Sequence, residues 1–420
     1  MFLKNNFLSS HLLSYPGGSI FMRNQIIKFL IIGLIYSLFA QETAISKTKD
    51  SNNPVLIGAV YNLTGDQAQL DVESSKGARL AVEEVNKAGG INGRAVELVL
   101  VDGKTDINVL KEEAKKLADN PGISLVIGLS DSDMVLSAAP PVAAAKKIFI
   151  TSGATSPLLP DEVPDYLYLS CFGDNVQAAV AAEYAYKDMD VRKVAVIKDK
   201  DTIYTQLLSK YFQERFEQLG GEIISIQSFK HNAPAFSDDQ IKTLKSIDNV
   251  SDLIFFAAET SYEASIIISR LRDAGFNQPI MGGDGYVDKD LIALIGKKAD
   301  NTYYTTHLFY DVATKNDALK DFMDAYKSFY KKEPTNPFAA LGYDAAKLAI
   351  NTIQKAGTAD MEALLKTLNN TNGFNGATGS ISYLGGSRVP LKSASIVQIK
   401  DGQSSLAAEM TPDKFPTPGK

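Results

Sequence analysis

"VLIGAVYNLTGDQAQLDVESSKGARLAVEEVNKAGGINGRAVELVLVD" occupies residues 55–102 and alternates between two kinds of pattern. Residues 55–60 form a short apolar run, which is typical of a buried strand. Residues 73–88 have helical spacing and stop at Gly89-Gly90, a pair that ends helices. Residues 96–101 are strand-like again. The stretch therefore predicts a strand, a helix and a second strand, which is the unit of a parallel sheet.

The same alternation continues along the chain in two series. In the first, helical patterns cover 107–118 and 132–145, and strand patterns cover 123–127 and 148–150. The second starts after Phe172-Gly173, with helices at 176–186, 204–219 and 262–274 and strands at 194–197, 222–228, 253–258 and 279–281. Helices at 317–330, 338–355 and 361–368 follow, with strands at 379–383 and 394–399. We predict an α/β protein whose two units each have a parallel sheet between layers of helices.

The N-terminal segment indicates export. "MRNQIIKFLIIGLIYSLFAQ" begins at Met22, a possible true start, and places Arg23 and Lys28 around the start of an apolar run, 29–40. The run is shorter than the ~20 residues that cross a bilayer, so we predict a cleaved signal within residues 1–40 and a polar leader at 41–53. An uncleaved anchor is the alternative. No cysteine follows the run, which excludes a lipoprotein anchor.

Composition excludes several classes of protein. The 420 residues suffice for about two or three domains. Lys and Arg number 43 against 49 Asp and Glu, with no basic block, so we expect no nucleic-acid partner. Cys171 is the single cysteine and the three histidines lie far apart, so we predict no disulfide, metal site or cofactor. The motifs of nucleophile elbows and phosphate-binding loops are absent, and an exported hydrolase is therefore disfavoured.

Small and polar residues follow several of the predicted strands. They lie at 61–65, 128–132, 151–156 ("TSGATS"), 259–261 and 282–285. In an open parallel sheet, ligands bind beyond the carboxyl ends of the strands, where helix N-termini offer N–H groups to an anion. Any one of these loops is explained as well by turn and capping residues. Five such loops in two units favour a shared ligand-binding cleft.

These residues also carry a family resemblance. The chain resembles the periplasmic leucine/isoleucine/valine-binding proteins, the type I solute receptors of ABC importers, in order over residues 54–402. The similar stretches are "VLIGAVYNLTGDQA", "SSKGARLAVEEVNKAGGINGRAVELVLVD", "LVIGLSDSDMVLSAAP", "FITSGATSP", "VAVIKDKDTIYTQ", "IMGGDGYV" and "AALGYDAAKLA".

The resemblance implies two Rossmann-like lobes that close on a ligand by hinge motion. Three crossings are expected near 171–173, 305–307 and 388–390. Lobe 1 would comprise 54–172 and 307–388, and lobe 2 would comprise 173–306 and 389–402, with a tail at 403–420.

The expected function is that of a non-enzymatic, monomeric periplasmic protein that delivers an amino acid or related small carboxylate to an ABC permease. A sensory receptor of the same fold without transport is the alternative.

The resemblance also implies the ligand-binding residues. Ser132 would bind the ligand carboxylate, Ala154 would offer backbone groups, and Thr155 would contact both amine and carboxylate. Tyr204 would close over the ligand, and Asp284 would pair with its α-ammonium group. Each has a structural alternative, such as a helix cap for Ser132 or a turn residue for Asp284.

Departures from the family pattern concern ligand choice. Leu70 stands where the family often has an aromatic residue, and Glu259, Thr260 and Ser261 replace an aromatic pair. Glu259 could face the cleft or be an exposed loop residue. These changes favour a polar amino acid or another small carboxylate over a purely aliphatic amino acid. Cys171, near the first crossing, is expected to be a buried thiol without a nucleophilic role.

Overall fold

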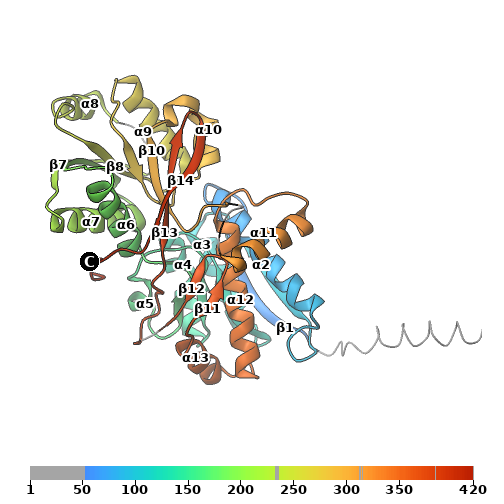
Figure 1. The fold of residues 1–420 in the computed structure, drawn as a ribbon. Helices are drawn as coiled ribbons and strands as arrows, with labels where there is room; N and C mark the ends of the chain where they lie inside the picture. The colour runs from blue at the N-terminus through green and yellow to red at the C-terminus, as the bar shows by residue number, and fades with distance from the viewer. Residues whose placement is uncertain (1–52, 232–235, 312–313, 315, 384, 420) are drawn as a thin grey trace, which may run out of the picture. The chain divides into compact units, whose positions relative to one another are not determined.

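Five parallel strands form the first sheet, in the order β2-β1-β3-β4-β5. Figure 1 shows where its first strand, β1, lies in the fold. The computed structural model describes residues 53–231, 236–311, 314, 316–383 and 385–419, which belong to one structural unit. The expected signal and most of the polar leader lie outside these residues. The strands are β1 (Val55–Tyr61), β2 (Val96–Asp102), β3 (Ile123–Gly128), β4 (Phe149–Thr151) and β5 (Leu167–Leu169), and they alternate with α2 (Ala68–Lys87), α3 (Ile107–Asp119), α4 (Ser132–Ala144) and α5 (Leu159–Glu162).

Helices pack on both faces of this sheet. Because successive side chains of a strand point to opposite faces, Leu125 and Ile127 of β3 pack with α2 and α12 (Phe338–Ala356), while Val126 packs with α3 and α4. A strand covered on both faces reads as a continuous apolar run, which is why the sequence revealed it. The first face also buries residues of α11 (Asp317–Tyr330), α13 (Met361–Asn369) and the hairpin β11 (Phe374–Gly376)–β12 (Gly379–Ile381).

The second sheet has the order β14-β13-β10-β9-β8-β6-β7. Five strands are parallel: β6 (Lys193–Asp199), β7 (Glu222–Phe229), β8 (Leu253–Ala257), β9 (Ile280–Gly282) and β10 (Thr302–Thr306). Two antiparallel strands, β13 (Ala394–Lys400) and β14 (Gln403–Met410), extend it beyond β10. The helices of this lobe are α6 (Asp174–Lys187), α7 (Ile203–Gln218), α8 (Asp238–Lys245), α9 (Ser261–Asp273), α10 (Asp288–Ile295) and the 3-10 turn η1 (Gly296–Ala299).

The C-terminal segment contains a strand where the sequence predicted only a tail from residue 403. Strand β14 pairs with β13, and most of its residues are exposed or half-exposed at the sheet edge. It therefore lacks the apolar run of a buried strand. The last residues lie along lobe 2, where Asn175 Nδ2 donates to the carbonyl of Pro416 at 2.9 Å and the Glu183 carboxylate accepts from the N–H of Asp413.

The chain passes between the lobes three times, in the connections β5–α6, β10–α11 and β12–β13. These connections contact one another. Phe172 of the first stacks on His307 of the second with ring centroids 4.0 Å apart, and Lys392 Nζ of the third donates to the carbonyl of Ser170 at 3.0 Å. Cys171 is buried, as expected, and burial raises the pKa of its thiol.

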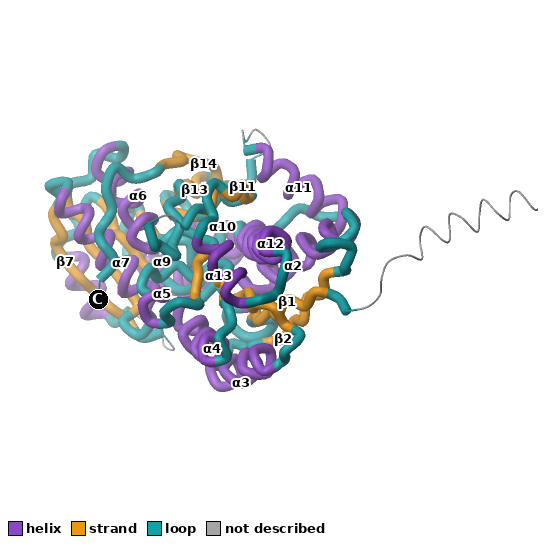
Figure 2. Tube along the Cα trace, turned by 90° about the horizontal axis from the view of Figure 1, so that it is seen from below, coloured by secondary structure: helices purple, strands orange, loops and turns teal. Residues whose placement is uncertain are grey.

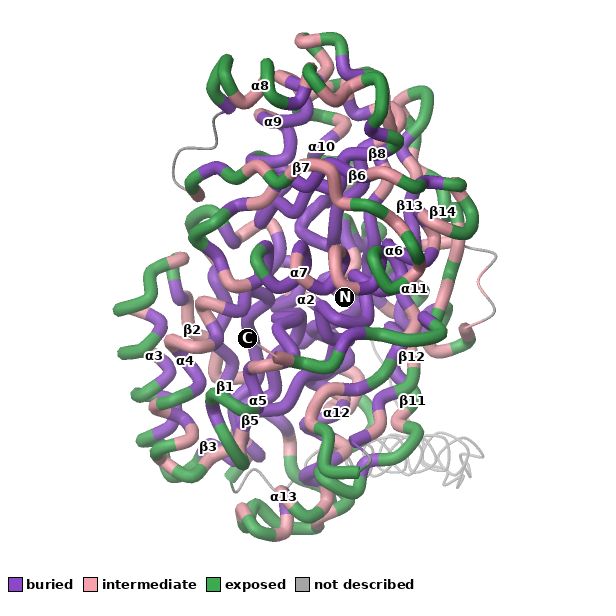
Figure 3. The backbone as a smooth tube through the Cα atoms, turned by 90° about the vertical axis from the view of Figure 1, so that its left-hand side faces the viewer, coloured by how far each residue is buried: buried purple, intermediate pink, exposed green. Residues whose placement is uncertain are grey.

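Burial separates the interior from the edges of both sheets. Figure 3 shows buried residues along the central strands and exposed ones on α8 and α13. None of the helices among the described residues combines the length and the apolar character that crossing a bilayer requires.

Helices α2 and α12 lie side by side at backbone contact distance (Figure 2). A Cβ atom added to Gly77 would lie 1.8 Å from the carbonyl oxygen of Ala339, and one added to Gly342 would lie 1.9 Å from that of Ser74. Rigid helix backbone cannot move aside as the tip of a side chain can. The two glycines therefore fix the spacing of the helices that cover one face of the first sheet.

Gly77→Ala and Gly342→Ala should each destabilise the protein by about 1–3 kcal/mol, because the added methyl group forces the helices apart. Urea unfolding measures the effect. Gln354→Ala, on the exposed side of α12, is the control and should change stability little. Unfolding midpoints of the glycine variants equal to that of the control would contradict the packing argument.

Candidate functional site

The carboxyl ends of strands from both sheets meet around a cavity of about 20 Å³. Its lining comes from α2, the loops after β3, β4, β8 and β9, and the starts of α4, α7 and α12. This is the edge of an α/β sheet at which ligands bind. The lining residues are Leu70, Ser130, Asp131, Ser132, Thr155, Tyr204, Glu259, Asp284, Gly285 and Phe338.

Most residues singled out from the sequence therefore lie around one cavity: Leu70, Ser132, Thr155, Tyr204, Glu259 and Asp284. Three others do not line it. The N–H of Ala154 is bonded to Thr151 Oγ1 at 3.3 Å and its carbonyl accepts from the Cys171 thiol. Thr260 caps α9, and Ser261 Oγ accepts from the N–H of Val287 at 2.7 Å.

The hydroxyl-rich loop after β4 has distinct roles for its members. Thr151 Oγ1 donates to the carbonyl of Leu129 and Ser152 Oγ bonds the hydroxyl of Tyr61, so both hold the loop. The N–H of Ser156 donates to Ser132 Oγ at 3.2 Å, which leaves the hydroxyl hydrogen of Ser132 available to another acceptor. Thr155 is the loop's buried side chain at the cavity, because Ser156 does not line it.

Asp284 is held by three side-chain donors. Its Oδ1 accepts from the Tyr204 hydroxyl at 2.8 Å and from Gln177 Nε2 at 2.9 Å, and its Oδ2 lies 2.8 Å from His307 Nε2. Burial lowers the pKa of His307, which favours the neutral ring, and Nε2 is then the nitrogen that donates to the carboxylate. These donors fix the Asp284 carboxylate at the cavity wall.

Asp174 lies on the far side of Gln177. The amide Nε2 of Gln177 donates to Asp174 Oδ1 at 2.9 Å as well as to Asp284. Burial raises the pKa of Asp174 to about 8, and the charge of Asp284 adds to the effect. The N–H of Asp174 also donates to the carbonyl of Thr155 at 2.7 Å, which connects the start of α6 to the loop after β4.

A second acidic group lies at the cavity around Glu259. Its Oε1 accepts from Gln67 Nε2 at 3.5 Å, and its buried Oε2 has no hydrogen-bond partner. Burial, followed by the charge of Asp131, raises the pKa of Glu259 well above its ordinary value. Asp131 itself caps α4 by accepting from the N–H of Met134 at 2.7 Å.

Two hydrogen bonds join the lobes next to this group. One is the bond from Gln67 to Glu259, and in the other the N–H of Ile203 donates to Asp133 Oδ2 at 3.0 Å. Burial, helped by the charge of Asp131, raises the pKa of Asp133 to about 6. The lobes are thus in contact around the cavity.

Asp199, His231 and Glu263 form the one His/carboxylate cluster with metal-ligand spacing among the described residues. His231 Nδ1 lies 2.9 Å from both Asp199 Oδ2 and Glu263 Oε1. The two carboxylates, Asp199 first, raise the pKa of His231 to about 10. The imidazolium therefore pairs with both carboxylates and balances one of their two negative charges, and no metal is needed to explain the contacts of the cluster.

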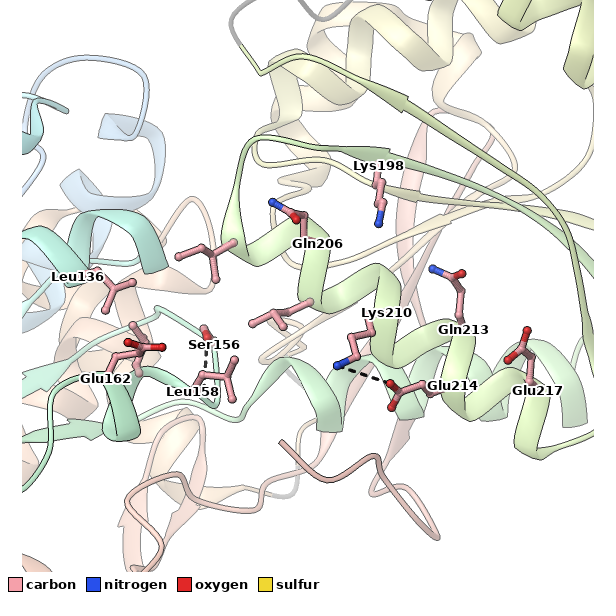
Figure 4. A pocket seen from close by; sticks show the side chains of 13 residues that line it. Leu136, Ser156, Leu158, Glu162, Lys198, Gln206, Lys210, Gln213, Glu214 and Glu217 are labelled. Atoms are coloured by element: carbon pink, nitrogen blue, oxygen red, sulfur yellow. Dashed lines mark hydrogen bonds and ion pairs between the residues drawn. The ribbon is translucent and has the colours of Figure 1, made fainter. Parts of the chain in front are cut away.

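A larger cavity of about 700 Å³ lies between α7 and the segment that contains α5 (Figure 4). Figure 4 shows Lys210 and Glu214 of α7 beside it, paired at 3.8 Å, and Glu162 on the opposite wall. None of the predicted ligand-binding side chains lines this cavity, and its charged groups are exposed or half-buried. We therefore place the functional site at the smaller cavity.

Sequence reasoning missed several residues of the site. Asp131 stood in a loop that the sequence had singled out. No sequence pattern marked Gln177 and Asp174 as part of the site, apart from their position after the first crossing. His307 was noted only as an isolated histidine near the second crossing, and Phe338 only as a helix start. Their roles depend on contacts between segments far apart in the chain.

Comparisons with known proteins agree with the fold. Residues 54–404 match a family model described as "Periplasmic binding protein". A Leu/Ile/Val-binding protein homologue (homolog 3) of Brucella melitensis is 30% identical over 330 residues, which are 78% of this chain and 87% of the relative.

Two solved structures are similar. The substrate-binding protein LivJ of a branched-chain amino acid transporter from Streptococcus pneumoniae, in complex with isoleucine, has a TM-score of 0.78 and 27% identity and covers 86% of this chain and 100% of that one. The leucine-binding protein LivK from Thermotoga maritima has a TM-score of 0.77 and 29% identity and covers 86% and 99%.

The ion pairs of His231 should make stability depend on pH. Because the pKa is raised from 6.5 to about 10 in the folded protein, the stabilisation is complete below pH 6.5 and is lost as the pH rises through 10. The melting temperature of wild type should exceed that of His231→Gln most near pH 6.5, and the gap should close toward pH 10.5. The control is Lys230→Gln, an exposed neighbouring cation. A gap that stays constant over this range would refute the ion-pair assignment.

Proposed function

Since the chain belongs to the periplasmic binding protein family, we propose that it captures an α-amino acid between its lobes and delivers it to an ABC importer. The family consists of solute-binding proteins, so this chain is a solute-binding protein and not an enzyme, as the sequence predicted. The predicted fold, two α/β lobes joined by three crossings, is confirmed as well. The ligand class, the importer, the periplasmic location and the monomeric state are our proposals.

One observation carries the choice of an amine-bearing ligand. The buried Asp284 carboxylate lines the cavity, and no Lys, Arg or His side chain is among the lining residues. A plain carboxylate ligand would bring a second negative charge beside Asp284 without a cation to balance it. An α-ammonium group instead forms a charge-assisted hydrogen bond with that carboxylate. This narrows the earlier prediction, which left related small carboxylates open.

The ligand carboxylate would bind opposite Asp284. The Ser132 hydroxyl has a free hydrogen, and Thr155 supplies a second hydroxyl at the same wall. Both stand at the amino end of α4, a 13-residue helix whose first N–H groups favour an anion. The isoleucine bound to the similar LivJ supports an amino acid as the ligand class.

Ligand entry requires the lobes to separate. A cavity of about 20 Å³ holds roughly one water molecule, whereas an amino acid is several times larger. Separation would break the bonds from Gln67 to Glu259 and from Ile203 to Asp133, which are two of the contacts between the lobes at the cavity. A ligand that contacts Thr155 in lobe 1 and Asp284 in lobe 2 would favour the closed form, because only that form offers both contacts.

Uptake of the ligand into vesicles distinguishes delivery to a permease from sensing without transport. Uptake of the ligand by vesicles that contain the cognate permease should depend on this protein if it serves transport. Ligand binding without any effect on uptake would favour the sensory alternative.

Asp284→Asn should weaken binding of the amino acid ligand by about tenfold to a hundredfold, because a charge-assisted bond is worth about 1.5–3 kcal/mol. A thermal-shift screen with amino acids identifies the ligand, and calorimetry then compares it with its des-amino analogue. The variant should barely change binding of the analogue. Asp161→Asn, an exposed carboxylate of α5, is the control. An equal loss of affinity for both compounds would contradict the proposal that Asp284 binds the amine.

Thr155→Val should weaken binding of both compounds by roughly fivefold to thirtyfold. The substitution keeps the volume but leaves a ligand oxygen unpaired in a dry, closed cavity, which costs about 1–2 kcal/mol. Calorimetry on the same pair of compounds measures it. Unchanged affinity would show that Thr155 serves the loop alone.

A further inference from the structure

We propose that the side chain of the ligand is cationic, as in lysine, ornithine or arginine, and that Asp131 and Glu259 bind its charged end. The inference rests on the proposed function, since it concerns the same cavity and assumes that Asp284 and Thr155 hold the α-amino acid group. The proposal concerns Glu259, one of the residues that stand where the family resemblance led us to expect an aromatic pair.

The cavity contains two acidic groups with different surroundings. Asp284 receives three side-chain donors from lobe 2 and from the second crossing, and the proposed α-ammonium group would be the fourth. Glu259 and Asp131 come from opposite lobes and have few donors between them, namely Gln67 Nε2 at 3.5 Å and the N–H of Met134. Asp284 therefore needs no hydrogen bond from a ligand side chain, whereas Glu259 and Asp131 still lack donors.

Unpartnered oxygen atoms point to the missing group. Glu259 is 95% buried, lines the cavity, and has an Oε2 atom without a hydrogen-bond partner. The buried Ser130 Oγ at the cavity wall and the neighbouring Gln67 Oε1 are also unpartnered. Leaving such groups unsatisfied in a closed protein interior is costly. Gln67 Oε1 and the oxygens of an ionised Glu259 only accept, so the missing partner of these two groups is a donor.

The charge balance makes that donor a cation. Asp131, Asp133 and Glu263 are the charged neighbours that act on Glu259, and all three are acidic. His231 is the nearby cation, and Asp199 and Glu263 already engage it. A neutral aliphatic side chain would leave Glu259 and Asp131 buried together, which is tolerable only if they keep a proton between them.

The rest of the wall suits the stem of a long side chain. Leu70 and Phe338 are the apolar side chains at the cavity, and both are at least 96% buried. Lysine-like side chains pack their methylene groups against apolar surface and keep the charged end at polar groups. A ligand held by Asp284 and Thr155 would thus pass its stem along Leu70 and Phe338 toward Glu259.

Proton release gives a direct readout. Burial and the charge of Asp131 raise the pKa of Glu259 well above its ordinary value, which favours the protonated carboxyl group in the absence of a cation. A bound cation favours the ionised form and displaces that proton to solvent. Binding should therefore release up to about one proton per ligand, and Glu259→Gln should abolish this release.

The test compares L-lysine, L-ornithine and L-arginine with L-norleucine, L-leucine and L-glutamine by calorimetry on the mature protein in two buffers of different ionisation heat. At least one basic amino acid should bind ten or more times more tightly than norleucine, with proton release. Glu259→Gln should remove most of this preference while binding of norleucine is kept. Asp131→Asn is the second variant, because asparagine caps α4 equally well and only the charge is lost. Glu97→Gln, an exposed residue of β2, is the control.

The outcomes separate the two proposals. If leucine, norleucine or glutamine binds as tightly as the basic amino acids, the cationic side chain is wrong while the amino acid function stands. If a basic amino acid binds but both charge variants keep the preference for it, the assignment to Asp131 and Glu259 is wrong. If no amino acid binds, or the des-amino analogue binds as well as the amino acid, the proposed function itself fails.

Discussion

Asp284 is the group on which the organisation of the site depends. Its carboxylate receives hydrogen bonds from Tyr204 of α7, Gln177 of α6 and His307 of the second crossing. Three segments that are distant in the chain are thereby fixed around one buried acid. Because a buried charge without such donors is expensive, the fold must supply them, and the same donors orient the carboxylate toward the cavity.

The hydrogen bonds around Asp284 extend through His307 to the segments that connect the lobes. His307 donates to Asp284 and also stacks on Phe172 of the first crossing. One imidazole ring therefore contacts both the acid at the cavity and the first crossing. His307 lies in the second crossing and stacks on the first. A ligand that changes the hydrogen bonding of Asp284 would therefore act on His307, which gives a physical basis for coupling ligand binding to closure of the lobes.

The first lobe depends on a different constraint. Gly77 and Gly342 let α2 and α12 touch through their backbones, and Leu70 and Phe338 reach the cavity from these same two helices. The close contact thus positions the apolar wall of the site. Acidic residues of both lobes, Asp131 and Glu259 among them, also line the cavity.

The sequence by itself determined the two α/β series, the strand ends that surround the cavity and most of the residues that line it. These follow from local patterns, since strands buried on both faces read as apolar runs and their polar ends stand out. The sequence did not predict the edge strand β14, because its residues are largely exposed and form no apolar run.

Only the tertiary structure decided that Glu259 faces the cavity, that Ala154 uses its backbone groups within its own lobe, and that His307 belongs to the site. The reason is physical. Burial and hydrogen-bond partners arise from contacts between segments separated by many residues, and no local pattern encodes which partners will meet.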